Sequence, residues 1–273
     1  MISEDVVIDS ARPPRGLNLR EIWRYRDLLL LLIRRDISVR YRQTALGVLW
    51  AVLQPIGQML IFSLIFGRLA RMPSDGVPYS LFAFAGLLPW LFFSNSFNAV
   101  GSSLVGSSNL ISKVYFPRLV VPLAAVGAPC VDLAISTICM FLLMFYQGYW
   151  PSLQILWLPA LFALTAITAV GVGTLIAALV VAYRDFRNLM QPMIMAWMFL
   201  TPVIYPPTIV PEHWRWVLYF NPMAGIVNAI RSAWFGRPFD FFSLGLSAGI
   251  SLLMLMIGLS YFRSVERRFA DII

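Results

Sequence analysis

The sequence has few charged residues for its length. Only 12% of its 273 residues are Asp, Glu, Lys or Arg, whereas 59% are hydrophobic. A soluble domain usually carries about 25% charged residues, so this chain has too little polar surface to cover a water-soluble globule. The composition excludes an ordinary soluble enzyme or binding module, and it indicates a protein whose solvent is the lipid bilayer.

Residue types that commonly carry catalysis or bind metals are also scarce. There is one histidine, His213, one lysine, Lys113, and two cysteines, Cys130 and Cys139. The cysteines are nine residues apart, about 13 Å along a helix, which is too far for a disulfide. No Cys/His cluster predicts a metal site, and no phosphate-binding loop is present, since Lys113 follows Ser112 rather than Gly. We expect no catalytic residue, no metal and no bound nucleotide in this chain.

Long apolar runs are abundant. A membrane-spanning helix needs about 20 mostly apolar residues, and six segments approach or exceed that length. They are predicted at residues 46–66, 79–100, 118–146, 153–182, 189–205 and 243–262. The predicted fold class is therefore an all-α integral membrane protein with six transmembrane helices.

The basic residues are unevenly distributed. Nine of the 20 arginines precede Gln43, beside the first predicted span. If the N-terminus is cytoplasmic, the inside segments hold 16 basic residues and the outside segments hold five. This asymmetry predicts that both ends of the chain are cytoplasmic, and an even number of spans agrees with it. Because the positive charge borders a span, nucleic-acid binding is not expected.

The N-terminal 45 residues divide into two predicted parts. Residues 1–17 form a polar tail without the apolar core of a cleavable signal, so the first span is expected to act as its own insertion signal. Residues 18–45 are predicted to form an amphipathic helix, with Asn18 and Glu21 in the spacing of a capping box. Such a helix would lie in the cytoplasmic interface; the alternative is the hydrated end of the first span.

Residues 206–242 do not resemble a span or a plain loop. They contain five prolines and three tryptophans among apolar residues. We predict two short re-entrant or interfacial helices, broken at Asn221-Pro222, before the last span. Backbone of this kind is tolerated at membrane depth only where it packs on protein or lines a water-filled cavity. A charged tail, residues 263–273, follows the last span.

Five patches along the chain resemble one family in order. They are RRDISVRYRQTALGVLWAVLQP (34–55), SSNLISKVYFPRLVVPL (107–123), YRDFRNLMQPMIMAWMFLTPVIYP (183–206), NPMAGIVNAIRSAWFG (221–236) and VERRFADII (265–273). Together they resemble the permease subunit of ABC-2-type exporters, in the branch that exports lipid-linked polysaccharide (O-antigen and capsule-like) or teichoic acid. Each patch is weak alone, and the ordered set covers nearly the whole chain. Only the tail before Asn18 has no evident counterpart.

The resemblance implies a homodimeric permease in a bacterial inner membrane. Two copies of a separate cytoplasmic ATP-binding cassette subunit would hold ATP and Mg²⁺, so this chain would contain no cofactor. The partners implied are therefore a second copy of the chain, the two ATPases, the lipid-linked polysaccharide and the bilayer.

The resemblance also implies a coupling helix in the cytoplasmic loop 101–118. The predicted ATPase-coupling residues are Asn109, Ile111, Lys113, Tyr115, Phe116, Pro117, Arg118, Arg184 and Asp185. Among them, Ile111, Tyr115 and Phe116 would be the apolar anchors, and Pro117 would fix the turn into the third span. The alternatives are an ordinary connecting loop at 101–118 and a cytoplasmic boundary marker at 183–185.

Two further sets of residues are candidates for the transport path. The predicted external gate comprises Trp214, Trp216, Asn221 and Pro222. The predicted channel-lining residues are Gln54, Gln58, Trp90, Asn95, Asn98, Gln191, Trp197 and Tyr205. Aromatic side chains are also common at the level of lipid headgroups, and amides also join helices within membranes, so both alternatives stay open.

The sequence also leaves functions other than polysaccharide export open. A related permease could export teichoic acid, lipid or drugs. A mostly apolar lateral cavity would favour lipid or drug efflux, whereas a continuous tunnel lined by aromatic and amide side chains would favour polysaccharide. A membrane enzyme acting on polyprenol phosphate would need clustered acidic residues or a metal site, whereas the acidic residues are scattered. A passive channel would need no ATPase-docking surface.

Overall fold

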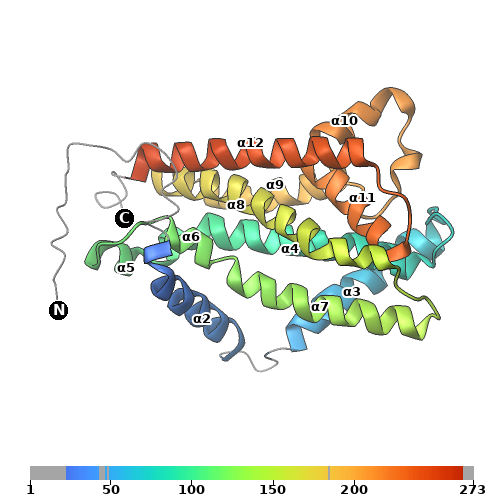
Figure 1. Ribbon diagram of the computed structural model, residues 1–273, viewed down its shortest axis with the longest axis horizontal. Helices are drawn as coiled ribbons and strands as arrows, with labels where there is room; N and C mark the ends of the chain where they lie inside the picture. The colour runs from blue at the N-terminus through green and yellow to red at the C-terminus, as the bar shows by residue number, and fades with distance from the viewer. Residues whose placement is uncertain (1–22, 43–46, 48, 184, 267–273) are drawn as a thin grey trace.

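The computed structural model describes residues 23–42, 47, 49–183 and 185–266 of the chain, and in that part it contains helices and no strand. Figure 1 shows long helices running lengthwise through the molecule. In chain order the elements are α2 (Arg26–Arg42), α3 (Leu49–Phe62), η1 (Ser63–Leu69), α4 (Tyr79–Gly106), α5 (Ser108–Lys113), α6 (Val120–Ala124), α7 (Gly127–Tyr146), η2 (Leu153–Trp157), α8 (Leu158–Ala182), α9 (Phe186–Leu200), η3 (Pro207–Ile209), η4 (Glu212–Trp214), α10 (Arg215–Phe220), α11 (Pro222–Phe235) and α12 (Phe241–Val265).

Helix α4 is the centre of the bundle. It packs along α8 and also contacts α3, α7 and α11, while α12 packs on the other side of α8. Of the apolar stretch of α4, 83% of residues are buried, against 28% for the α7 and α12 spans and 17% for Leu49–Leu69. The three outer spans therefore present most of their apolar side chains to the surroundings, as expected for lipid contact or a second copy of the chain.

Two glycines bring α8 and α12 close together. A Cβ on Gly258 would overlap the carbonyl oxygen of Gly171, and a Cβ on Gly171 would lie 2.6 Å from the backbone nitrogen of Leu255. Beside this contact, the hydroxyls of Thr168 and Ser251 are hydrogen-bonded at 2.7 Å. Small residues and interhelical hydroxyl bonds are the usual means of joining helices in a bilayer.

Five helical segments are long and apolar enough to cross a membrane: Leu49–Leu69, Tyr79–Gly106, Val120–Tyr146, Leu153–Ala182 and Phe241–Val265. The all-α membrane architecture is confirmed, but the predicted count of six spans is not established. The predicted fifth span, 189–205, is α9, which has only 15 residues and rises about 22 Å. It ends because Thr201 precedes Pro202 and is extended, as the proline ring disfavours a helical residue before it.

The second span is longer than predicted. It was expected to end at Val100, but α4 continues to Gly106 through the Ser/Gly-rich sequence. The hydroxyl of Ser102 donates to the carbonyl of Asn98, and that of Ser103 donates to the carbonyl of Val100, both at 2.7 Å. Serines bonded to the preceding turn are compatible with a helix, so this polar stretch does not begin the loop.

Helix α2 lies obliquely against the starts of α6 and α7 (Figure 1). Its residue Leu32 is buried, and Asp132 of α7 binds its last turn. Asp132 forms an ion pair with Arg40 at 2.5 Å and accepts a hydrogen bond from the Tyr41 hydroxyl at 2.5 Å. Burial and this hydrogen bond raise the pKa of the Tyr41 phenol, so the hydroxyl remains a donor. The predicted capping box, Asn18 with Glu21, lies outside the described residues.

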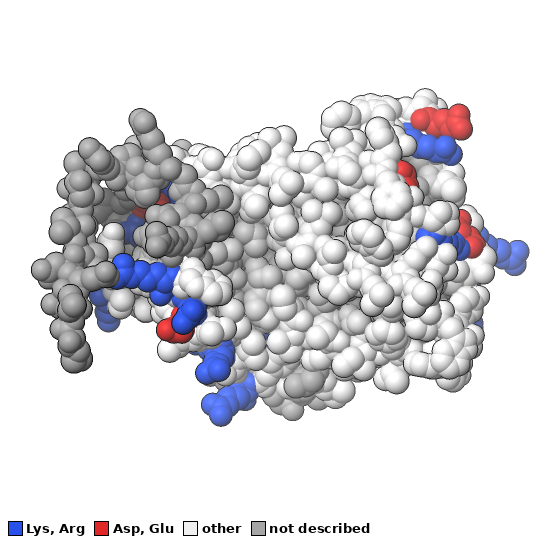
Figure 2. All heavy atoms as spheres, in the orientation of Figure 1, with Lys and Arg blue, Asp and Glu red and all other residues white. Residues whose placement is uncertain are grey.

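The charged side chains are at the two ends of the molecule. Figure 2 shows Lys, Arg, Asp and Glu toward both ends of this face, and a surface between them that is almost free of charge. We call the end with α2 and α5 the α5 end, and the end with α10 the α10 end. This distribution agrees with a bilayer surrounding the middle of the bundle, because charges inside a hydrocarbon core are costly.

Candidate functional site

The α5 end contains the segment predicted to couple to an ATPase. Within it Ile111 and Phe116 are only 6% and 5% exposed, and both pack with Leu32 of α2 and Phe262 of α12. Their prediction as apolar anchors for a partner is wrong, because side chains buried in this chain present no surface to another protein. They hold the segment against the bundle instead.

The exposed side of the same segment is different. Tyr115 is 77% exposed and Val114 is 51% exposed, and Asn109 and Lys113 are exposed beside them. This combination gives a small protruding surface with an aromatic ring, an apolar side chain and one positive charge. Sequence reasoning included Tyr115, Asn109 and Lys113 but missed Val114, since nothing in the pattern distinguishes its orientation from that of Ile111.

Arg118 fixes the end of this segment to α12. Its backbone nitrogen donates to Oε1 of Glu266 at 3.1 Å, and its guanidinium donates to the Glu266 carbonyl oxygen. Pro117, just before it, is half-buried. Asp185 is exposed immediately before α9; Arg184, predicted beside it, lies outside the described residues. Arg118 was predicted as a contact to the ATPase. In the structure it bonds within the chain and braces this segment against the end of α12.

The α10 end contains the two short helices predicted before the last span. They are α10 and α11, and they meet at Asn221-Pro222. Pro222 occupies the first turn of α11, where its missing N–H is harmless, and Gly236 ends α11 with a φ of 68°, a conformation that favours glycine. The local sequence thus fixes both ends of α11.

Asn221 joins α10 and α11 to the end of α9. Its Oδ1 accepts from the backbone nitrogen of Met223 at 3.1 Å and from Nε1 of Trp197 at 2.9 Å. Its Nδ2 donates to the Leu200 carbonyl at 3.1 Å and to the Thr201 hydroxyl at 2.9 Å. The Asn221 amide therefore uses its oxygen and its nitrogen to connect the junction of α10 and α11 to the end of α9.

The two predicted gate tryptophans lie on the surface. Trp214 and Trp216 are each 55% exposed, and their rings stack at 6.5 Å with an interplanar angle of 22°. Pro222, in contrast, is buried. The tryptophans are thus accessible at the surface of the chain, whereas Asn221 and Pro222 hold the junction of α10 and α11.

Sequence reasoning missed Arg231, a buried cation on α11. It is 4% exposed, and its guanidinium donates to the carbonyls of Pro202, at 2.6 Å, and Val203. Its charged carbon lies 3.7 Å from the centre of the Phe82 ring, where cation–π attraction is favourable. The sequence signal that could have identified this buried cation is an arginine within the mostly apolar run 222–234.

The predicted channel-lining residues do not gather in one place. Gln54 and Asn95 line one narrow crevice between α3, α4 and α7, together with Asp132 and Ser136. Gln58 and Asn98 are half-buried and Gln191 is exposed on α9.

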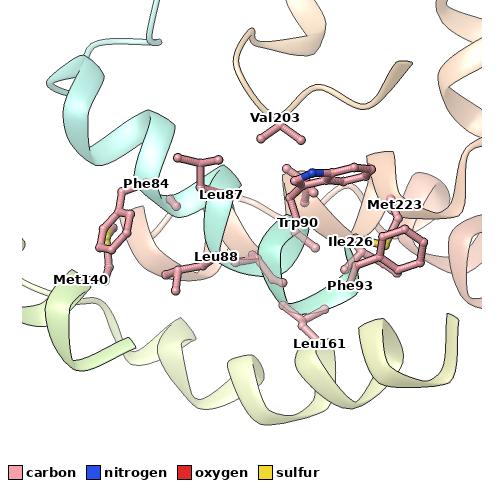
Figure 3. Packing of buried hydrophobic residues seen from close by; sticks show 14 of the residues in the cluster. Phe84, Leu87, Leu88, Trp90, Phe93, Met140, Leu161, Val203, Met223 and Ile226 are labelled. Carbon is pink, nitrogen blue, oxygen red and sulfur yellow. The ribbon is translucent and has the colours of Figure 1, made fainter. Parts of the chain in front are cut away.

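Of the three aromatic residues predicted for the channel, Trp90 is only 2% exposed. Figure 3 shows its ring in the core near Val203 and Phe93. Its prediction as a channel-lining residue is wrong, because a side chain enclosed within one subunit faces no channel. Trp197 is half-buried and bonds to Asn221, and the Tyr205 hydroxyl donates to the Phe199 carbonyl at 3.1 Å.

Comparison with known proteins finds relatives whose names agree with one another. The chain is 31% identical over 256 residues to the O-antigen export system permease protein RfbA of Myxococcus xanthus, covering 93% of this chain and 98% of the relative. It is 27% identical to the RfbA protein of Klebsiella pneumoniae, covering 90% and 95%. It is 24% identical to the polysialic acid transport protein KpsM of Escherichia coli, covering 86% and 92%.

The family profile described as ABC-2 type transporter matches residues 27–235. This range extends from α2 to the end of α11, so it includes the exposed α5 segment and the junction at Asn221-Pro222. The chain therefore belongs to the ABC-2 type transporter family.

Proposed function

We propose that this chain is the permease subunit of an ATP-driven exporter that moves lipid-linked polysaccharide of the O-antigen or capsule type across a bacterial inner membrane. Two copies of the chain form the conduit, and two separate ATP-binding cassette subunits, which hold ATP and Mg²⁺, supply the energy. The substrate class is supported by the names of the relatives from three bacteria. Export of teichoic acid, lipid or drugs by the same architecture is the alternative.

The observation that carries the proposal is the exposed surface at Val114 and Tyr115 on a rigid support. Ile111 and Phe116 pack beneath it, and Arg118 joins it to Glu266 at the C-terminal end of α12. A push on this surface would be transmitted to α2, α8 and α12 rather than absorbed by a loose loop, because packed elements move as units. We assign this end to the cytoplasm, in agreement with the arginine distribution.

At the opposite end, α10 and α11 would form the gate. The Asn221 amide connects them to the end of α9, so a shift of α9 would move the junction of the two helices. The exposed apolar faces of α3, α7 and α12 supply the surfaces for lipid and for the second copy. The subunit carries out no covalent chemistry in this mechanism.

A matched pair of variants tests the coupling assignment. Tyr115→Ala removes an exposed ring, so we expect the purified chain to keep its melting temperature but to lose at least tenfold in capture of its partner ATPase. Glu212→Ala at the opposite end is the control and should leave capture unchanged. Full capture and full surface polysaccharide with Tyr115→Ala would overturn the coupling surface. A strain lacking the chain that still displays its surface polysaccharide would overturn the substrate class.

A further inference from the structure

A cavity of about 220 Å³ lies at the α10 end, between the segment after α9 and helices α10, α11 and α12. It is smaller than the roughly 300 Å³ at which pockets for drug-sized ligands begin, so it fits one ring rather than an oligomer. Six of its lining residues carry polar side chains: Thr208, Arg215, Tyr219, Asn228, Asp240 and Ser243. Leu218 and three prolines or alanines complete the wall.

Several of these polar groups have unused hydrogen-bonding capacity. From Pro222 to Trp234, every residue of α11 is buried except Asn228, which lines the cavity. Within the described chain its amide makes no hydrogen bond, although it offers two donors and an acceptor. Asp240 uses Oδ1 to cap α12 by accepting from Ser243 N at 3.1 Å, and it forms no ion pair with any described residue.

The charges in the cavity favour a neutral ligand. Arg215 donates from Nε to the Val210 carbonyl at 3.2 Å and pairs with Glu212 at 3.6 Å. Asp240 contributes the opposite charge to the same cavity. A phosphate would meet this carboxylate, and like charges at short range repel. A sugar ring suits the cavity better, because each hydroxyl both donates and accepts.

The surroundings of the cavity place it at the level of lipid headgroups. Five large aromatic residues that lie within two positions of lining residues in the sequence are more than half exposed: Trp214, Trp216, Phe220, Phe241 and Phe242. Aromatic residues concentrate at the membrane–water interface. The Tyr219 ring, which lines the cavity, is held edge-on against Phe242 at 5.7 Å. A ligand here would therefore come from the outer surface of the bilayer or from the path of export.

We propose that this cavity binds a single neutral pyranose ring, hydrogen-bonded by Asn228, Asp240 and Arg215 and packed against Tyr219. The proposal rests on the proposed function, which brings glycan to this end of the molecule. The ring is either a residue of the exported polysaccharide or the headgroup of a glycolipid. Binding there holds α10, α11 and α12 to the ligand at the point where the gate would open.

The test is protection of a cysteine in the cavity. The chain carrying Ser243→Cys, with Cys130 and Cys139 replaced by alanine, is purified with its ATPase in phospholipid nanodiscs and labelled with a membrane-impermeant maleimide. Oligosaccharides released by mild acid from the surface polysaccharide of the encoding bacterium are added in one arm. Nanodiscs containing that bacterium's glycolipid are used in the other.

Protection in the first arm identifies the exported glycan, and protection in the second identifies a glycolipid headgroup. In either case we expect labelling to slow at least threefold. His213→Cys, exposed outside the cavity, should label at an unchanged rate. Asn228→Ala in the Ser243→Cys background should abolish the protection, and Asp240→Asn should weaken it while keeping the helix cap, since Asn caps as well as Asp.

Unchanged labelling of Ser243→Cys in both arms overturns the cavity assignment. Protection that persists in Asn228→Ala overturns it too, because the ligand would then lie elsewhere. Loss of surface polysaccharide in a strain lacking the chain, combined with unchanged labelling, overturns the cavity assignment alone. Normal surface polysaccharide in that strain overturns the proposed function, whatever the labelling shows.

Discussion

The guanidinium carbon of Arg231 lies 3.7 Å from the centre of the Phe82 ring, inside the bundle. Its two terminal nitrogens donate to the carbonyls of Pro202 and Val203, so one cation joins α11 to α4 and to the segment after α9. No carboxylate of the described chain forms an ion pair with it. Carbonyl dipoles and an aromatic face therefore compensate for the loss of water around this charge.

Gly86 is the residue that makes room for this arrangement. A Cβ there would lie 2.5 Å from both Nη2 of Arg231 and the Val203 carbonyl oxygen. We predict that Gly86→Ala destabilises the chain by about 1–3 kcal/mol, as overpacking usually does. The loss of stability is measured by thermal unfolding of the detergent-purified protein, with size-exclusion elution as the readout. Gly106→Ala on the same helix, with open space around its Cβ, is the control, and equal melting temperatures would contradict the prediction.

Added side-chain volume should also destabilise the contact between α8 and α12. Because a Cβ on Gly258 would overlap the Gly171 backbone, Gly258→Ala must separate the two helices. We expect a lower melting temperature and less protein in the membrane fraction. Gly249→Ala on α12 has open space and should behave as wild type; if both variants behave alike, the close approach is not needed.

The Asp132–Arg40 pair is predicted to anchor α2 to α7. The Asp132 side chain is 13% exposed and that of Arg40 is 36% exposed, so the pair is only partly screened. We expect Asp132→Asn and Arg40→Gln each to cost about 1–3 kcal/mol, less than the 3–5 kcal/mol of a fully buried pair. The double variant should cost less than the sum of the two, as a double-mutant cycle detects. Additive effects, or export that depends on a proton gradient, would argue against a purely structural pair.

Phe116 should affect stability rather than docking. Since its ring is 5% exposed and packs in the cluster with Leu32 and Phe262, we predict that Phe116→Ala costs about 3–5 kcal/mol. Protein that remains folded at low temperature should still bind the ATPase. A variant that melts as wild type but no longer binds would restore the ring as a direct contact.

Asn221 is predicted to control the junction of α10 and α11. Asn221→Asp keeps the oxygen that caps α11 and accepts from Trp197, but it loses the two donors to Leu200 and Thr201. Asn221→Ala loses all four bonds, so we expect it to destabilise by about 1–2 kcal/mol more than Asn221→Asp, the cost of a cap and a hydrogen bond. Thermal unfolding separates the two, and indistinguishable variants would show that the amide is dispensable.

Composition and pattern alone determined the class of protein. The low charge, the apolar runs and the prolines around Asn221-Pro222 are local properties, and the all-α membrane bundle with α10 and α11 follows from them. The boundaries of α4 and α9 depended on local details, the serine hydroxyls of 102 and 103 and the proline at 202. These details are visible in the sequence, although their effect was underestimated.

Only the tertiary structure decided which side of each helix faces the protein. In a bilayer, lipid-facing and core-facing side chains are equally apolar, so hydrophobicity does not distinguish the buried Trp90 from the exposed Trp214. The same reason explains why the buried Ile111 and Phe116 were grouped with the exposed Tyr115 as contacts to a partner. The pairing of Asp132 with α2, the Arg231–Phe82 contact and the cavity at Asn228 join residues far apart in the chain, and packing alone brings such residues together.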